Sequence, residues 1–149
     1  IEAEILPTTR ALGIAITAYG ILSRGLIGGL GRQPLDPQDW RSHSPRFQGE
    51  NLQANLKLVA ALDKLAQEKN ATAAQLAIAW VAAQGPDIVP LIGTKSRKRL
   101  AESLGALEIK LTPQDLAAIE QAVPAHAVAG ARYDARQMAM LDSERRSAS

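Results

Sequence analysis

A cluster of basic side chains follows directly after a glycine in the stretch PLIGTKSRKRLAES, residues 90–103. Lys95, Arg97, Lys98 and Arg99 lie almost side by side there, although the formal net charge of the whole chain is only +2. Neighbouring like charges repel one another, so a negatively charged partner is expected at this turn. An anion such as a phosphate group would supply it.

The residue types around the cluster suit a phosphate. Ser96 is well placed as the N-cap of a helix that begins at Arg97, so the first amides of that helix would point outward with partial positive charge. Gly93 would let the backbone approach a ligand closely, and the hydroxyl groups of Thr94 and Ser96 would add hydrogen-bond donors. Together these groups predict an anion site.

Longer side chains flank the same turn. Lys95 and Arg99 could contact a phosphate from either side, and such charge-assisted contacts are about twice as strong as neutral ones. Arg99 lies one helical turn before Glu102 and Ser103, so these groups face roughly the same way. The turn could therefore hold a phosphate together with an attached base.

Two other interpretations of the basic turn stay open. Runs of charge are usually a solvated helix face. A basic helix can also bind nucleic acid, but this short cluster lacks the wider basic stripe and the aromatic stacking platform of nucleic-acid-binding proteins. We therefore expect no nucleic-acid partner.

Composition predicts one soluble domain. The chain has 149 residues, of which 46% are hydrophobic and only 3% aromatic, a mixture that favours closely packed helices. The absence of cysteine excludes disulfides and thiolate metal sites and fits a cytoplasmic location. No apolar run approaches the ~20 residues of a membrane span, so no membrane partner is expected. Because the chain starts at Ile1 in what reads as a helix, we expect a piece of a longer protein.

Helices and strands alternate along the sequence. We expect a helix at residues 2–12 that feeds a buried strand at 14–19, and then a long irregular loop at 20–49, which could be a lid, a binding loop or disordered. The later elements are expected at residues 51–69 (helix), 72–85 (helix), 88–92 (strand), 97–104 (helix), 113–123 (helix) and 138–141 (short helix), before a tail at 143–149. Thr72 with Gln75 and Thr112 with Asp115 have capping-box spacing. Strands that follow helices imply parallel pairing, but two strands cannot make a buried parallel sheet.

Four segments together resemble the C-terminal half of an aldo-keto reductase. They read ITAYGILSRGLIGG, RFQGENLQANLKLV, TAAQLAIAWVAAQGPDIVPLIGTKSRKRLAESLGAL and GARY. The resemblance implies an α/β fold, the (β/α)8 TIM barrel, with residues 1–149 as the C-terminal, NADPH-binding half that carries the last two strands. It also implies reduction of an aldehyde or ketone with NADPH. Such barrels often bind phosphate after strands seven and eight.

The resemblance assigns roles to individual residues. Tyr19 matches the tyrosine that stacks on the nicotinamide, although its sequence alone would fit a core tyrosine. The stretch along the pyrophosphate includes Gly20, Leu22 and Arg24. The segment that binds the adenosine 2′-phosphate corresponds to Gly93, Thr94, Lys95, Ser96 and Arg99. The residues beside the adenine correspond to Glu102 and Ser103.

The resemblance also implies what this chain lacks. The catalytic tyrosine, lysine, aspartate and histidine of the family belong to the first half of the barrel, so the isolated chain is expected to be inactive, with the missing half as its partner and a small carbonyl compound as substrate. A non-catalytic NADPH-binding regulatory protein, similar to potassium-channel β-subunits, is the alternative. An independent helical module that binds nucleic acid is a third hypothesis.

Other polar and aromatic residues have no assigned role. We interpret His43 and His126 as solvated loop histidines, because neither has partners at metal-ligand spacing. Trp40 could line a substrate pocket or hold the long loop down as a hydrophobic plug. Arg132 and Tyr133 could fold back towards the mouth of the cofactor site.

Overall fold

The computed structural model describes residues 1–141, so the expected tail at 143–149 lies outside the described residues. The regular elements in chain order are α1 (Ile5–Ala11), β1 (Ile16–Ala18), α2 (Gly49–Glu68), α3 (Ala73–Ala82), β2 (Ile88–Pro90), α4 (Arg97–Leu104), α5 (Pro113–Ala122) and α6 (Ala135–Met138). The 3-10 turns are η1 (Ser23–Gly25), η2 (Trp40–His43), η3 (Pro45–Phe47), η4 (Gly105–Glu108) and η5 (Ala125–Ala127). Among the described helices, none combines the length and the apolar character that a bilayer crossing requires.

The two strands lie side by side and run parallel, as the sequence predicts. Ala18 of β1 is opposite Pro90 of β2. The amide of Leu91 donates a hydrogen bond to the carbonyl oxygen of Ala18 at 2.8 Å, so the missing N–H of Pro90 interrupts no bond to β1. Because the strands are parallel, Tyr19 and the basic turn follow them at the same edge of the sheet.

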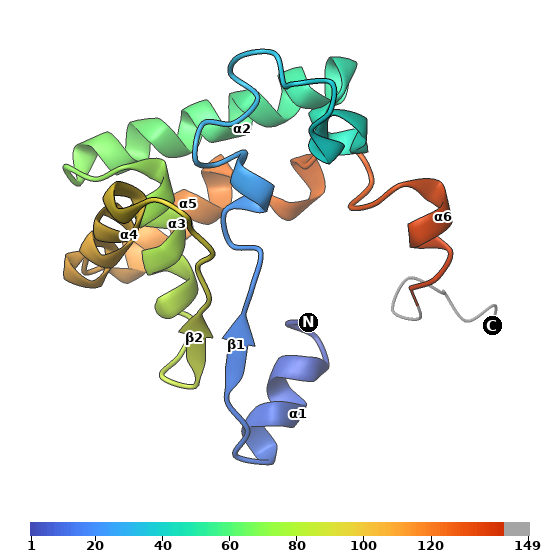
Figure 1. The fold of residues 1–149 in the computed structure, drawn as a ribbon. Helices are drawn as coiled ribbons and strands as arrows, with labels where there is room; N and C mark the ends of the chain where they lie inside the picture. Colours follow the sequence, from blue (N-terminus) through green and yellow to red (C-terminus); the bar gives the residue numbers. More distant parts are fainter. Residues whose placement is uncertain (142–149) are drawn as a thin grey trace.

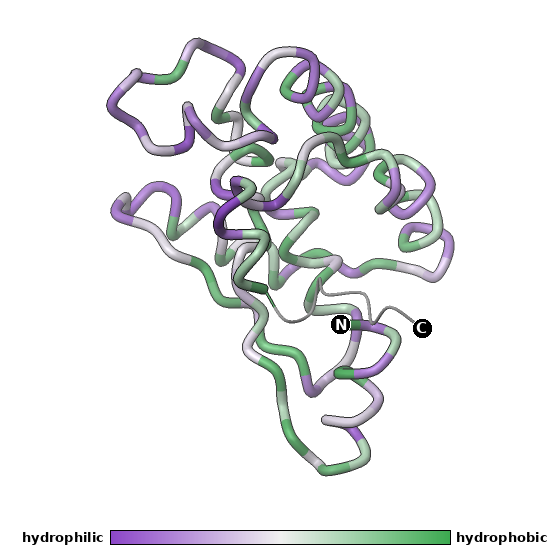
Figure 2. The backbone as a smooth tube through the Cα atoms, turned by 90° about the vertical axis from the view of Figure 1, so that its right-hand side faces the viewer, coloured by the Kyte–Doolittle hydropathy of each residue, from purple (hydrophilic) through white to green (hydrophobic). Residues whose placement is uncertain are grey.

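The strand after the first helix is not buried. Ile14 is 51% exposed and Tyr19 is 76% exposed, and Val89 of the neighbouring strand is 52% exposed. The expectation of a buried strand at residues 14–19 is therefore wrong, because residues 1–141 give β1 one neighbouring strand and leave much of its surface uncovered. The strands and α1 extend from one side of the helical cluster (Figure 1), and Figure 2 shows hydrophobic segments in this extended part.

The hydrophobic core lies among the helices instead. Leu62 and Ala66 from α2, Leu76 from α3 and Ile119 from α5 are buried against one another. Leu76 is 0% exposed. A second buried cluster packs the loop at residues 20–48 onto α2. The helices thus form the stable base that carries the two strands and their following turns.

Element ends differ from the predicted ends by a few residues. The first helix begins at Ile5, each strand spans three residues, and α3 ends at Ala82, before Gly85. The last short helix covers Ala135–Met138 instead of 138–141. Helix and strand ends depend on a few local bonds, so they are harder to predict than the elements themselves.

Both predicted capping boxes are present. Thr72 accepts from the amide of Gln75, and Thr112 accepts from the amide of Asp115, with the reciprocal bonds also formed. The carboxylate of Asp115 additionally pairs with the Lys69 ammonium at 2.8 Å, which joins the end of α2 to the start of α5.

We expect this junction to make the protein acid-sensitive. The hydrogen bond from Lys69, together with those from Thr112, lowers the pKa of Asp115 from 3.8 to about 2. A carboxylate with a lowered pKa stabilises the fold fully above pH 4, and that contribution disappears as the pH falls towards 2. Urea midpoints at pH 6 and pH 2.5 should therefore differ less for Asp115→Asn than for the unchanged protein. Equal differences would show that the pair makes no such contribution.

Candidate functional site

The basic turn presents its positive charge to solvent. Lys95, Arg97, Lys98 and Arg99 are all exposed. Within residues 1–141, none of the four forms an ion pair. The counter-charge that the sequence suggests is therefore not supplied by the described part of the chain, and the four cations are available to an anion from outside.

The backbone of the turn is organised by two hydroxyl groups. The Thr94 hydroxyl oxygen accepts from the amide of Ser96 at 3.1 Å, and the Ser96 hydroxyl oxygen accepts from the amide of Arg99 at 3.4 Å. Ser96 is thus the N-cap that the sequence predicts. The amides of Arg97 and Lys98 make no hydrogen bond within the described residues, so these two amides are the helix-end donors left for a ligand.

The polar residues one turn further along α4 already form hydrogen bonds within the chain. The Ser103 hydroxyl donates to the carbonyl oxygen of Arg99 at 2.9 Å. The carbonyl oxygen of Glu102 accepts from the side-chain amide of Gln75 at 2.9 Å, which fixes α4 against α3. Glu102 and Ser103 are half-buried beside the turn. Gly93 faces open space, with no atom within 4 Å of the position of a Cβ.

Tyr19 lies at the end of β1 with its ring exposed, so it is not a core tyrosine in this chain. It approaches Tyr133 from the C-terminal segment. A hydrogen bond with Tyr19 lowers the pKa of the Tyr133 phenol, and a hydrogen bond with Arg24 lowers it further. Arg132 and Tyr133 are expected to fold back towards the mouth of the cofactor site, and the structure places Tyr133 beside Tyr19 at the end of β1.

The segment after Tyr19 turns sharply into the long loop. Gly20 has φ +76°, a left-handed conformation that suits glycine. Leu22 packs against the main hydrophobic core. The Arg24 guanidinium lies 4.5 Å from the centre of the Tyr133 ring and 5.3 Å from that of Trp40, so it points towards the C-terminal segment.

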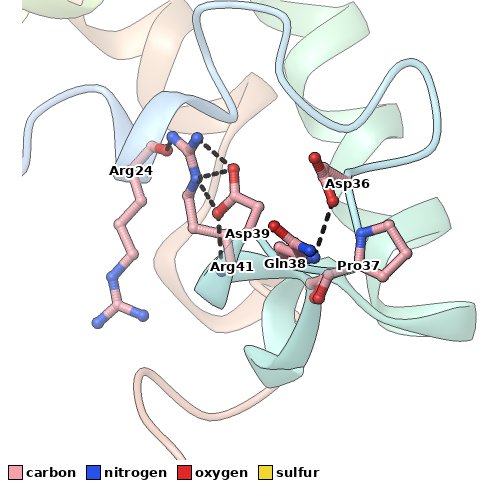
Figure 3. A network of polar contacts seen from close by, with 7 residues as sticks. Arg24, Asp36, Pro37, Gln38, Asp39 and Arg41 are labelled. Atoms are coloured by element: carbon pink, nitrogen blue, oxygen red, sulfur yellow. Dashed lines mark hydrogen bonds and ion pairs between the residues drawn. The ribbon is translucent and has the colours of Figure 1, made fainter.

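The loop at residues 20–49 is held by its own polar contacts. The amide and the guanidinium of Arg41 both donate to the carboxylate of Asp39, and Arg41 also donates to the carbonyl oxygen of Arg24 at 3.1 Å (Figure 3). The bonds from Arg41 lower the pKa of Asp39 to about 2. Figure 3 shows the Arg24 guanidinium pointing away from this carboxylate. The loop is therefore a fixed wall of the site.

A cavity of about 640 Å³ opens between this loop, β1, α2 and the C-terminal segment. Its wall is largely apolar and includes Leu26, Phe47, Val59, Leu62 and Val123. Polar side chains also line it, and they are Thr17, Tyr19, Ser23, Arg24, Arg46, Asn55, Arg132 and Tyr133. A cavity of this size and character suits a small organic ligand.

The sequence analysis missed Asn55, a lining residue that joins the loop to the C-terminal segment at this cavity. Asn55 is 2% exposed, and its side-chain amide donates to the carbonyl oxygens of Arg46 and Ala129, at 3.1 and 2.9 Å. Its side-chain oxygen accepts from the amide of Ala129 at 2.9 Å. The signal was available: Asn55 follows Leu52 by three residues and precedes Val59 by four, on the apolar stripe of α2.

The remaining candidates, His43, His126 and Trp40, lie outside the lining of this cavity. His43 and His126 are exposed, and residues 1–141 hold no group of acidic or histidine side chains able to bind a metal ion. Trp40 is 60% exposed and does not line the cavity, so it is neither a pocket wall nor a buried plug. Its contact with Arg24 is its clearest interaction.

Comparison with known proteins matches this arrangement to one family. The model of the aldo/keto reductase family matches residues 1–124. The chain belongs to the aldo/keto reductase family. Within it, Probable aldo-keto reductase 1 of Glycine max is 47% identical over 135 residues, which are 89% of this chain and 39% of that protein. Aldo-keto reductase yakc of Schizosaccharomyces pombe, whose name specifies NADP(+), is 41% identical over 134 residues and is likewise covered to 39%.

The fold of this aldo/keto reductase chain agrees with that of a solved relative. Glycerol dehydrogenase AKR11B4 from Gluconobacter oxydans superposes with a TM-score of 0.77 at 28% identity, over 88% of this chain and 40% of that protein. The predicted TIM barrel is thus confirmed as the fold to which the chain belongs, and the chain forms part of one. It spans about two-fifths of the length of the relatives it matches.

Proposed function

We propose that this chain is the cofactor-binding part of an NADPH-dependent oxidoreductase that reduces an aldehyde or ketone to an alcohol. Bound NADPH would supply a hydride to the carbonyl carbon while a proton reaches the carbonyl oxygen, which leaves NADP⁺ and the alcohol. Membership of the aldo/keto reductase family and the NADP(+) in the name of a relative support this proposal.

One observation carries the proposal. The basic turn and Tyr19 follow two paired parallel strands at the same edge of the sheet. The turn offers four exposed cations without ion pairs among residues 1–141, and Tyr19, with its aromatic ring, is 76% exposed. A phosphate-bearing dinucleotide with an aromatic nicotinamide fits this combination of charge and ring surface.

The residues of the turn fit the adenosine 2′-phosphate. Lys95 and Arg99 would contact it, and the amides of Arg97 and Lys98 would donate to it. Gly93 leaves room for a close approach. We further propose that Thr94 and Ser96 act mainly by shaping the turn, because their hydroxyl groups already accept backbone hydrogen bonds.

The same geometry suggests roles for the other residues that the resemblance assigns to the cofactor. Tyr19 would stack on the nicotinamide, and Gly20 and Leu22 would follow the pyrophosphate. Glu102 and Ser103 would adjoin the adenine, with the Ser103 hydroxyl already engaged by Arg99. The remainder of the barrel would supply the proton donor and complete the carbonyl site, so we propose that this chain alone does not turn over substrate.

Arg99→Ala tests the assignment. In the full-length protein, loss of a charge-assisted contact to the 2′-phosphate should weaken NADPH binding by about 10- to 100-fold. NADH lacks that phosphate, so its affinity should change little. Fluorescence titration with both nucleotides measures the two dissociation constants, and Arg136→Ala, an exposed arginine on α6, is the matched control.

Two results would contradict parts of the proposal. An equal loss of NADPH and NADH affinity in Arg99→Ala would remove the 2′-phosphate assignment. NADPH binding without carbonyl-dependent NADPH oxidation by the full-length protein would support the regulatory alternative instead of a reductase. Each result is read from a separate assay, so the cofactor site and the activity are tested independently.

A further inference from the structure

Arg24 and Arg46 enter the cavity beside β1 without a carboxylate partner among residues 1–141. Arg10 and Arg41 differ in this respect. Arg10 pairs with Asp87 at 2.9 Å, and the guanidinium of Arg41 is held by the carboxylate two residues before it. No carboxylate among residues 1–141 therefore compensates the charge of the two cavity arginines.

The partners of the two cavity arginines accept only some of the hydrogen bonds that a guanidinium can donate. Arg24 donates to the Ser44 hydroxyl at 3.3 Å, and Arg46 donates to the carbonyl oxygen of Gly130 at 3.3 Å. A guanidinium has five N–H donors, and Arg24 additionally has a hydrogen bond and a ring contact with Tyr133. Several donors of each remain for a ligand.

The two charges also disfavour each other. Burial lowers the pKa of Arg46, and the positive charges of Arg24 and Arg132 lower it further. Like charges brought together in a partly buried place are unfavourable unless an anion compensates them. Asn55 holds the backbone carbonyl of Arg46, and the carbonyl oxygen of Gly130 holds its guanidinium, so the fold keeps this charge in place.

The apolar wall of the cavity limits the kind of anion that could bind at the two arginines. The wall beneath the arginines is formed by aliphatic and aromatic side chains such as Leu26, Phe47 and Val59. A pyrophosphate has no apolar surface to cover such a wall. A carboxylate on an apolar body would place its charge at the arginines and its body against the wall, and guanidinium groups bind carboxylates with two parallel hydrogen bonds.

We propose that Arg24 and Arg46 form a carboxylate-binding subsite, and that the carbonyl substrates of this protein include aldehydes or ketones with an apolar body and a carboxylate remote from the carbonyl. This inference rests on the proposed reductase function for the identity of the reacting group. The subsite is separate from the basic turn after β2, which would hold the cofactor phosphate.

A matched pair of substrates tests the subsite in the full-length protein. 4-Carboxybenzaldehyde and methyl 4-formylbenzoate share a body and differ in charge. For Arg46→Met, kcat/KM for the acid should fall by about 10- to 100-fold, mainly through KM, while kcat/KM for the ester stays unchanged. Arg46→Lys keeps the charge and should recover part of the loss. Arg24→Met should behave like Arg46→Met, and Arg136→Met is the control.

The outcomes separate this inference from the proposed function. If the acid and the ester lose equally, or if the variants weaken NADPH binding instead, the subsite binds no substrate carboxylate and the inference is wrong. If neither aldehyde is reduced by the unchanged protein, the reductase function fails, and calorimetric titration with 4-tert-butylbenzoate then decides the subsite. Binding that is lost in Arg24→Met and Arg46→Met supports it, and an absence of binding overturns it.

Discussion

Asn55→Ala is expected to destabilise the protein by about 2–4 kcal/mol, because buried polar groups that lose their partners keep their full desolvation penalty. The side chain of Asn55 makes three hydrogen bonds to backbone groups, two of them to Ala129 and one to Arg46. Alanine would leave all three groups unpaired in a place where Asn55 itself is only 2% exposed.

The same substitution should release the C-terminal segment from the cavity. Ala129 and Gly130 immediately precede Arg132 and Tyr133, so loss of the Asn55 bonds would remove Tyr133 from its contact with Arg24. Hydrogen exchange at the Ala129 amide reports this directly, and the urea midpoint of the full-length protein reports the change in stability.

Asn51→Ala is the matched control for this prediction. Asn51 lies one turn earlier on α2 and makes a single hydrogen bond, to the carbonyl oxygen of Pro45 at 3.1 Å. Its loss should cost about 1 kcal/mol. Similar midpoints for the two variants, with unchanged exchange at Ala129, would mean that Asn55 does not hold the segment.

Local features of this fold could be predicted from the sequence because their causes are local. Ser96 caps α4, and Thr112 and Asp115 cap α5, through bonds between residues three positions apart. The parallel pairing of the strands followed from the helices between them. The exposed charge of the basic turn agrees with one interpretation of the sequence, in which a run of charge forms a solvated helix face.

The burial of the strands could not be predicted from the chain alone. Residues 14–19 are apolar enough for a buried strand, but burial needs other elements on both sides of it. The described residues supply only one neighbouring strand. An apolar pattern therefore indicates that a strand is suited to apolar contacts. Whether the strand is exposed depends on whether other elements are present to cover it.

The cavity depends on contacts that are distant in the sequence. Arg46 meets Gly130 across 84 positions, and Asn55 meets Ala129 across 74. Such pairs leave no periodic signal. The direction of the Arg24 side chain is equally non-local, because it is set by Tyr133 and Trp40. The resemblance alone assigned Arg24 to the pyrophosphate, and only the structure revealed its contact with the C-terminal segment.

Leu76→Ala is expected to lower the free energy of unfolding by about 3–5 kcal/mol, because truncating a fully buried leucine loses its burial and leaves a cavity. Leu76 is 0% exposed and contacts Leu62 and Ala66 of α2 and Ile119 of α5. It therefore joins all three helices of the core. The destabilisation should also affect the proposed cofactor site, since α3 leads into β2 and the basic turn.

Two further variants show whether the effect comes from the core. Leu107→Ala removes the same atoms from a residue that is 74% exposed and should change stability little. Leu76→Met nearly conserves volume and should cost less than about 1.5 kcal/mol. Urea unfolding of the full-length protein compares the three. If Leu76→Ala were no worse than Leu107→Ala, the stability of this part of the protein would have to come from elsewhere than the packing of α2, α3 and α5.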